Sequence, residues 1–147
     1  MLQGKLIHPQ ILGALGRGGH GSKVLLSDGN YPHVTKKGPN SELVYLNLAP
    51  GQFGVCDVLK LLTTVIPVEK AEVMAVAKSG PYAMAKDPEI WNDFRALLAD
   101  TDCKGDLIPI EKPEFYAAGA SPDVCLCIAT GEQRIYANLL LTIGVVR

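Results

Sequence analysis

KVLLSD, residues 23–28, is a short apolar run that lies between two groups of turn-forming residues. Gly18 and Gly19 end a helical pattern before it, and Gly-Asn-Tyr-Pro at 29–32 follows it. A nearly continuous apolar run of this length, bounded by turn residues, is typical of a buried strand. Residues 23–28 therefore predict a strand inside a sheet.

Segments with apolar residues at helical spacing lie on either side of this strand. Pro9 stands in the first turn of the first segment, where a helix leaves the backbone N–H unpaired. Pro67 is expected to end the second segment, and Asp87 to cap the third, with Pro88 at its first helical position. The predicted helices lie at 6–19, 54–66 and 87–100.

Short apolar segments alternate with these helices along the chain. The further predicted strands lie at 42–46, 72–78, 107–110, 124–130 and 136–146. Helices that alternate with nearly continuous apolar strands are typical of a parallel sheet. We therefore expect an α/β fold in a single domain, residues 1–147, with a mostly parallel sheet flanked by helices in Rossmann-like layers. The last two strands are expected to form an antiparallel hairpin.

The composition argues against several classes of protein. The chain has 147 residues, of which 48% are hydrophobic and 20% charged, as in an ordinary globular domain. Its 14 Lys and Arg against 15 Asp and Glu give a formal net charge of −1, without a positive surplus for nucleic acid or acidic lipid. No secretory leader and no apolar run of the ~18 residues needed by a membrane helix are present. We expect a cytoplasmic protein without nucleic-acid or membrane partners.

The cysteines and histidines show no pattern of a metal or redox site. Cys125 and Cys127 alternate on a predicted strand, so we expect them to share one face as reduced core residues. His8, His20 and His33 have no i, i+4 spacing and no carboxylate in a known ligand pattern. Nucleotide-binding glycine motifs and the Gly-x-Ser-x-Gly motif are also missing. We therefore expect no metal and no cofactor.

His20 and Asp28 stand at the two ends of the first predicted strand. His20 lies between glycines after a helix end, where an imidazole can exchange a proton near neutral pH, or where it is simply part of a turn. Asp28 follows the strand, where ligands of parallel sheets collect, or where it caps the next turn. A straight strand would separate the two by about 20 Å. A site that uses both therefore needs a bend in the chain or a neighbouring subunit.

A third candidate cluster lies in ATGEQRIYANLLL at 129–141. Tyr136 and Asn138 are two residues apart at the start of a predicted strand, so we expect them to face the same side. A phenol and an amide can bind hydroxyl groups, but both residue types are also common where a turn enters a strand. The residues alone leave both alternatives open.

Several motifs follow one another along the chain: HPQILGALGRGGHG, SDGNYP, DPEIWNDF, IEKPEFY and ATGEQRIYANLLL, followed by GVV near the end. Their order resembles the D-ribose pyranase and L-fucose mutarotase family across nearly the whole chain. Gly-His-Gly, the Ser-Asp that precedes a Tyr-Pro, and Phe115-Tyr116 make it more similar to the fucose branch than to the ribose branch.

The resemblance implies an isomerase that interconverts the cyclic forms of a free monosaccharide without cofactor or metal. It also implies a ring of subunits, often a decamer. It assigns catalysis to His20 and Tyr116, with Tyr136 or a water as alternatives for the second proton, and substrate binding to Asp28, Lys112, Tyr136, Ala137 and Asn138. Lys112 stands where fucose mutarotases usually have arginine, and lysine lacks the planar fork of arginine.

The expected function is therefore a monosaccharide mutarotase that acts on L-fucose or a related sugar by acid–base ring opening. Two alternatives stay open, a non-catalytic sugar-binding protein and a ribose-type pyranase. A wall of the site from another subunit would resolve the separation of His20 and Asp28.

Overall fold

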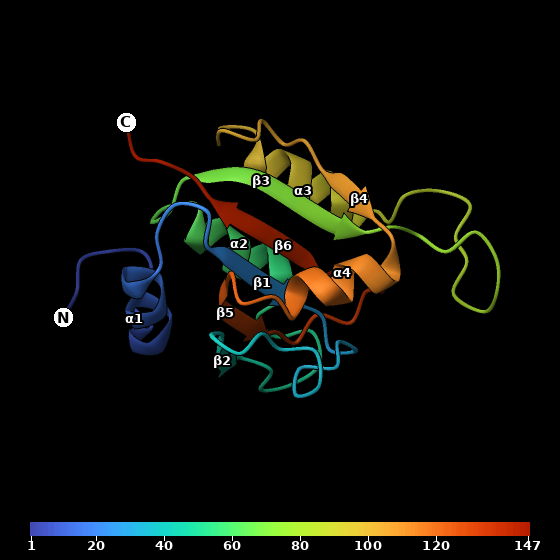
Figure 1. The fold of residues 1–147 in the computed structure, drawn as a ribbon, viewed down its shortest axis with the longest axis horizontal. Coiled ribbons are helices and arrows are strands. Elements are labelled where there is room, and N and C mark those ends of the chain that lie inside the picture. The colour runs from blue at the N-terminus through green and yellow to red at the C-terminus, as the bar shows by residue number, and fades with distance from the viewer.

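Six strands form one mixed sheet in the order β2-β5-β1-β6-β3-β4 in the computed structural model, which describes residues 1–147 (Figure 1). β6 is antiparallel to its neighbours β1 and β3, and every other neighbouring pair is parallel. The α/β class with a mostly parallel sheet is thus confirmed. The strands are β1 Lys23–Ser27, β2 Glu42–Tyr45, β3 Val68–Met74, β4 Ile108–Ile110, β5 Val124–Ala129 and β6 Leu139–Ile143.

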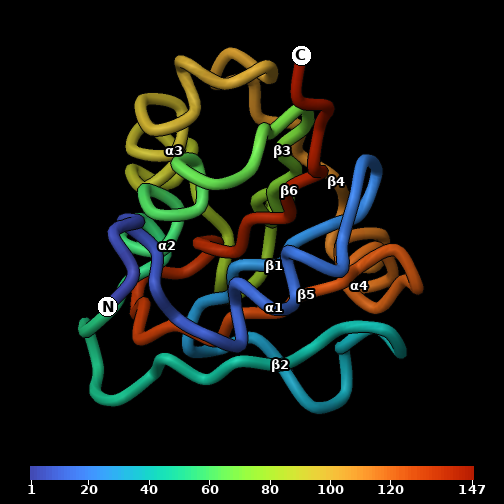
Figure 2. Tube along the Cα trace, turned by 90° about the vertical axis from the view of Figure 1, so that its left-hand side faces the viewer, coloured from blue at the N-terminus to red at the C-terminus, as the bar shows by residue number.

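Helices cover both faces of this sheet. One face packs against α1, α2 and α3 through a core of 26 buried residues. The other face packs against α4 through a smaller cluster of seven that includes Phe115. Figure 2 shows α2 and α3 on one side of β3 and β6 and α4 on the other. The helices are α1 Pro9–Arg17, α2 Val55–Leu62, α3 Ile90–Leu98 and α4 Lys112–Gly119.

β1 lies inside the sheet, as its apolar sequence predicts. Val24, Leu25 and Leu26 are fully buried. Val24 and Leu26 belong to the larger core and Leu25 to the smaller one, because successive strand residues point to opposite faces. A strand buried on both faces cannot alternate polar with apolar residues, which explains its continuous apolar run.

The predicted hairpin of the last two strands is wrong. β1 lies between β5 and β6, so these two strands are not neighbours. The expectation that Cys125 and Cys127 share a face is also wrong, since the pairing of β1 with β5 shifts by one residue at Cys125. Cys127 joins the smaller cluster and Cys125 packs against the larger one. All four cysteines are free, and burial raises the pKa of Cys127 to about 11, which keeps its thiol protonated.

Several predicted boundaries differ from the observed ones. α2 ends at Leu62, before Pro67, and α3 begins at Ile90 with Glu89 at its N-cap. Asp87 does not cap α3, because its carboxylate pairs with the Arg95 guanidinium at 3.2 Å instead. β3 begins four residues earlier than predicted, and β6 begins only at Leu139.

The segment KPEFYAAG forms the helix α4, which the sequence did not identify as one. Only Phe115 and Gly119 of α4 are buried, so this helix lacks the broad apolar stripe that identifies the other helices in the sequence. The longest helices have nine residues, and none is long and apolar enough to cross a bilayer.

Candidate functional site

A pocket of about 380 Å³ lies at the edge of the sheet where the parallel strands end and β6 begins. Ligands collect at this edge in open α/β sheets. The pocket takes residues from the ends of β1 and β3, from α4 and from the two segments that follow β3 and precede β6. Its lining is Asp28, Asn30, Tyr31, Met74, Tyr82, Lys112, Tyr116, Ile135, Tyr136 and Asn138.

Asp28 is the most firmly held polar group of the pocket, with only 2% of its surface exposed. Its Oδ1 accepts a hydrogen bond from the Asn30 amide at 2.9 Å, and its Oδ2 accepts one from Asn138 Nδ2 at 3.0 Å. The backbone N–H of Asp28 in turn donates to Asn138 Oδ1 at 2.9 Å. This two-way contact fixes both side chains in one orientation, so Asn138 positions the Asp28 carboxylate.

Burial raises the pKa of the Asp28 carboxyl. Hydrogen bonds from the backbone at Asn30, Ala137 and Tyr31 and from the side chain of Asn138 lower it in part. Ala137 is completely buried, so its contribution to the site comes from its backbone. The result is a fixed acceptor that can take hydrogen bonds from ligand hydroxyl groups.

Lys112 and Tyr116 reach the pocket from the first two turns of α4. The Tyr116 ring packs edge-on against Tyr31 with centroids 5.6 Å apart, and Lys112 Nζ lies 5.7 Å from the Tyr116 centroid. Lys36 Nζ lies at a similar distance, 5.9 Å. The Tyr116 hydroxyl makes no hydrogen bond within the chain, so it is free to bind a ligand.

The Tyr136 hydroxyl is already engaged by the backbone. It accepts a hydrogen bond from the Ala77 amide at 3.1 Å and donates one to the Tyr82 carbonyl at 2.8 Å. The Tyr136 carbonyl accepts from Trp91 Nε1 at 3.0 Å. Tyr136 thereby ties the loop 75–89 to the pocket, and Figure 1 shows this loop extending beyond the end of β3.

Tyr136 and Asn138 do not lie on one strand as expected, because both precede β6 and Tyr136 has a φ of 57°. They face the same pocket because the turn before them is held in place. Glu132, only 6% exposed, accepts hydrogen bonds from Arg134 Nε and Nη2, both at 2.9 Å, and from the backbone amide of Gln133. The Arg134 guanidinium holds the pKa of Glu132 below its usual value.

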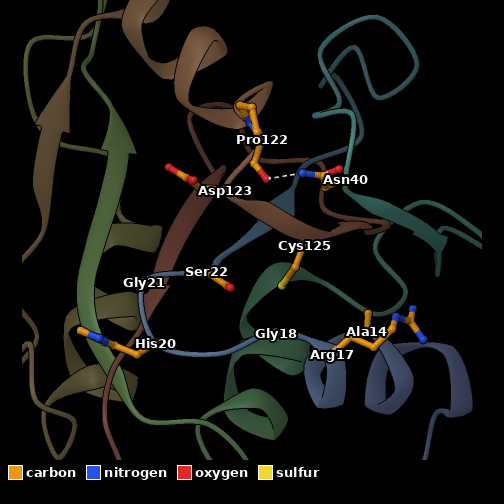
Figure 3. A pocket seen from close by; sticks show the side chains of 10 residues that line it. All are labelled: Ala14, Arg17, Gly18, His20, Gly21, Ser22, Asn40, Pro122, Asp123 and Cys125. Carbon is orange, nitrogen blue, oxygen red and sulfur yellow. Dashed lines mark hydrogen bonds between the residues drawn. The ribbon is translucent and has the colours of Figure 1, made fainter.

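His20 lies at the opposite edge of the sheet, beside a second cavity of about 520 Å³ (Figure 3). Figure 3 shows its ring pointing away from Arg17, Ser22 and Cys125 and toward β3. Its side chain is 58% exposed and its Nε2 lies 3.0 Å from Glu69 Oε2. β1 therefore separates His20 from Asp28 within one chain, as the length of the strand predicts.

The structure thus gathers Asp28, Lys112, Tyr116, Ala137 and Asn138 around one pocket, with Tyr136 at its wall and His20 apart. Sequence reasoning missed several lining and contacting residues. Tyr31 stands in the Gly-Asn-Tyr-Pro turn that follows the first predicted strand, so its position gave a usable signal. Met74 is the last residue of β3, but the predicted strand continued to residue 78, so its position gave none. Tyr82 and Glu69 had no local signal. No group of three or more potential metal-ligating side chains is present.

Known proteins resemble the chain over nearly its full length. The model of the RbsD / FucU transport protein family matches residues 1–146. Fucose mutarotase of Mus musculus is 29% identical over 147 residues, which cover 95% of this chain and 90% of the mouse protein.

Solved structures give the same result. The fucose mutarotase of Streptococcus pneumoniae in complex with L-fucose has a TM-score of 0.78 and 27% identity, with 97% of this chain and 96% of that chain covered. RbsD of Bacillus subtilis complexed with D-ribose has a TM-score of 0.80 over the whole of both chains, and at 23% identity it shows the shared fold. The chain therefore belongs to the RbsD/FucU family.

Proposed function

We propose that the protein is a monosaccharide mutarotase that interconverts the α and β anomers of L-fucose or a related free sugar. The observation that carries this proposal is the pocket at the carboxyl edge of the sheet. It presents a fixed carboxylate at Asp28, a free phenol at Tyr116 and an ammonium group at Lys112. These groups can accept hydrogen bonds from the hydroxyls of a small sugar and donate hydrogen bonds to them. The names of the mouse and pneumococcal relatives support the substrate class.

The proposed reaction opens and recloses a hemiacetal. One proton is delivered to the ring oxygen while the anomeric hydroxyl loses another, and the C1–ring-oxygen bond breaks to give the aldehyde. Rotation about the C1–C2 bond and reclosure give the other anomer. Mutarotation is already measurable in water, so a modest reduction of the barrier suffices, and one or two correctly placed acid–base groups supply it.

The contacts of each group support the following proposed roles. His20 carries one proton, and Tyr116 carries the other. We assign the second proton to Tyr116 rather than Tyr136 because the Tyr136 hydroxyl is engaged by Ala77 and Tyr82. Asp28 accepts from sugar hydroxyls, Lys112 donates to them, and Asn138 holds Asp28. The backbone at Ala137 and the side chain of Tyr136 shape the wall of the pocket.

The proposed site is completed by a second subunit. His20 and the Asp28 pocket lie at opposite edges of one sheet, so one chain cannot place both against a single sugar. A head-to-tail contact that sets His20 of one subunit against the Asp28 pocket of the next would close into a ring. We propose a homo-oligomeric ring, with the decamer as the expected form. The free cysteines suit a reducing compartment, and we place the activity in the cytoplasm.

The deciding experiment is NMR saturation transfer between the α and β anomeric protons of L-fucose, D-ribose, L-rhamnose and D-galactose. Accelerated exchange that His20→Ala abolishes would support the proposal. Acceleration of pyranose–furanose exchange in D-ribose alone would indicate a pyranase instead. Binding without acceleration of any sugar would indicate a non-catalytic sugar-binding protein.

A further inference from the structure

The exposed imidazole of His20 is held by a carboxylate from a different strand. His20 Nε2 lies 3.0 Å from Oε2 and 3.2 Å from Oε1 of Glu69. Glu69 is the second residue of β3, 49 residues away in sequence. Both carboxylate oxygens face Nε2, so Glu69 contacts this ring nitrogen and not Nδ1.

Three neighbouring strands bring the two residues together. The turn that carries His20 is bonded to the end of β6, because the Gly21 amide donates to the Ile143 carbonyl at 2.9 Å. The end of β6 is bonded to the start of β3, because the Gly144 amide donates to the Pro67 carbonyl at 2.9 Å. The register of the sheet therefore places Glu69 within reach of His20.

Two glycines, Gly21 and Gly144, lie in the backbone next to this contact. Gly21 has a φ of +83°, a conformation that residues with a side chain rarely adopt, and this turns the chain directly after His20. A Cβ on Gly144 would lie 3.2 Å from the Cβ of Glu69 and would crowd it. The backbone at Gly21 and Gly144 thus supports the contact between His20 and Glu69.

We propose that Glu69 is the positioning residue of His20 and that Nδ1 is the nitrogen that exchanges a proton with the sugar. A carboxylate has no proton to donate, so Nε2 carries the hydrogen of this contact. The neutral ring then has its lone pair on Nδ1, and the protonated ring has its transferable proton there. This inference rests on the proposed function.

The proton transfers balance with this assignment. In ring opening, neutral Nδ1 of His20 takes the proton of the anomeric hydroxyl, while the Tyr116 phenol gives its proton to the ring oxygen as the C1–oxygen bond breaks. In reclosure, the Tyr116 phenolate recovers a proton from the hydroxyl that attacks the aldehyde, and Nδ1–H of the protonated His20 gives its proton to the new anomeric oxygen. Nε2–H stays bonded to Glu69 throughout and is not transferred.

The assignment has a spectroscopic test that does not need activity. The chain has only 3 histidines, so labelling with ¹⁵N-histidine gives few ring signals, and His20→Ala identifies those of His20. At a pH where the ring is neutral, we expect a protonated Nε2 and a bare Nδ1 in the wild type and in Glu69→Gln, whose amide oxygen still accepts. Glu69→Ala should show a measurable fraction of the other tautomer. A wild-type ring with its proton on Nδ1, or a ring unchanged in Glu69→Ala, would overturn the assignment.

Kinetics test the positioning role. Because general acid–base catalysis contributes on the order of 10²–10⁴-fold, loss of orientation should lower kcat about tenfold in Glu69→Ala, with KM nearly unchanged and a smaller loss in Glu69→Gln. Glu69→Ala should add nothing to His20→Ala. Asp102→Asn is the matched control, since Asp102 is a second acidic residue beside Gly144 and makes no contact with His20.

The two proposals fail in different ways. If Glu69→Ala keeps full activity while His20→Ala is inactive, the role of Glu69 is wrong and the mutarotase proposal stands. If the wild type accelerates no sugar, the mutarotase proposal fails, and the ring tautomer alone then decides whether Glu69 orients His20.

Discussion

Two inactive variants of this protein should restore activity to each other when they share one oligomer. His20→Ala removes the proposed proton carrier at one edge of the sheet, and Asp28→Asn impairs the pocket at the other edge. If each site takes His20 from one subunit and the Asp28 pocket from its neighbour, a mixed interface can combine the intact half of each variant. Each variant alone has no intact site.

The expected recovery follows from counting interfaces. In a randomly mixed 1:1 ring, half of the subunits supply an intact His20 and half supply an intact pocket. The two choices are independent at each head-to-tail interface, so about one quarter of the sites are intact, and we expect about one quarter of the wild-type exchange rate.

The assay is saturation transfer on the best sugar of the panel, after co-expression of the two variants with different affinity tags and tandem purification. The same variants mixed as preformed oligomers without subunit exchange are the control and should stay inactive. Asp28 is buried, so Tyr116→Phe, which removes only an unbonded hydroxyl, is the second pocket variant if Asp28→Asn folds poorly. Well-mixed oligomers without recovered activity would refute the shared site.

Three further predictions concern stability and the shape of the pocket. Asn138→Ala should lower the free energy of unfolding by about 2 kcal/mol in urea denaturation, because the buried Asp28 carboxylate and amide both lose a partner. The pKa of Glu132 lies below its usual 4.5, so its stabilising contribution is present above that pH and is lost as the pH falls through the lowered value. Wild type should therefore lose more stability than Glu132→Gln between about pH 6 and about pH 3 in thermal melts. Tyr136→Phe should speed hydrogen exchange of the Ala77 amide severalfold while the amides of β1 stay protected, and equal exchange in both proteins would show that the hydroxyl does not hold the loop.

The local patterns of the sequence predicted most of the fold and part of the site. Apolar runs and helical spacing located β1, α1, α2 and α3. A strand buried on both faces needs a continuous apolar run, and a helix buried on one side needs apolar residues at helical spacing. The pairing of β6 with β1 and β3 was not predictable in this way, since its register depends on residues 113 to 119 positions apart for β1 and 66 to 75 positions apart for β3. The bulge at Cys125 and the helix α4 likewise lack a local signature.

The site shows the same division. Asp28 and Asn138 stand next to strand ends, where a polar residue beside an apolar run indicates a candidate site residue. The hydrogen bonds between them join residues 110 positions apart, so only the assembled sheet shows that Asn138 positions the Asp28 carboxylate. The occupied hydroxyl of Tyr136 and the contact of Glu69 with His20 are also products of the tertiary structure.

The position of β6 has a consequence for biosynthesis. β2, β5 and β1 form one half of the sheet and β3 and β4 the other, and β6 is the only strand that joins them. It is also the last strand in sequence order, so a growing chain on the ribosome holds two half-sheets that cannot pair into one sheet until residues 139–143 have emerged. Until then the edges of β1 and β3 are open to other nascent chains, and aggregation during synthesis is the risk that this topology carries.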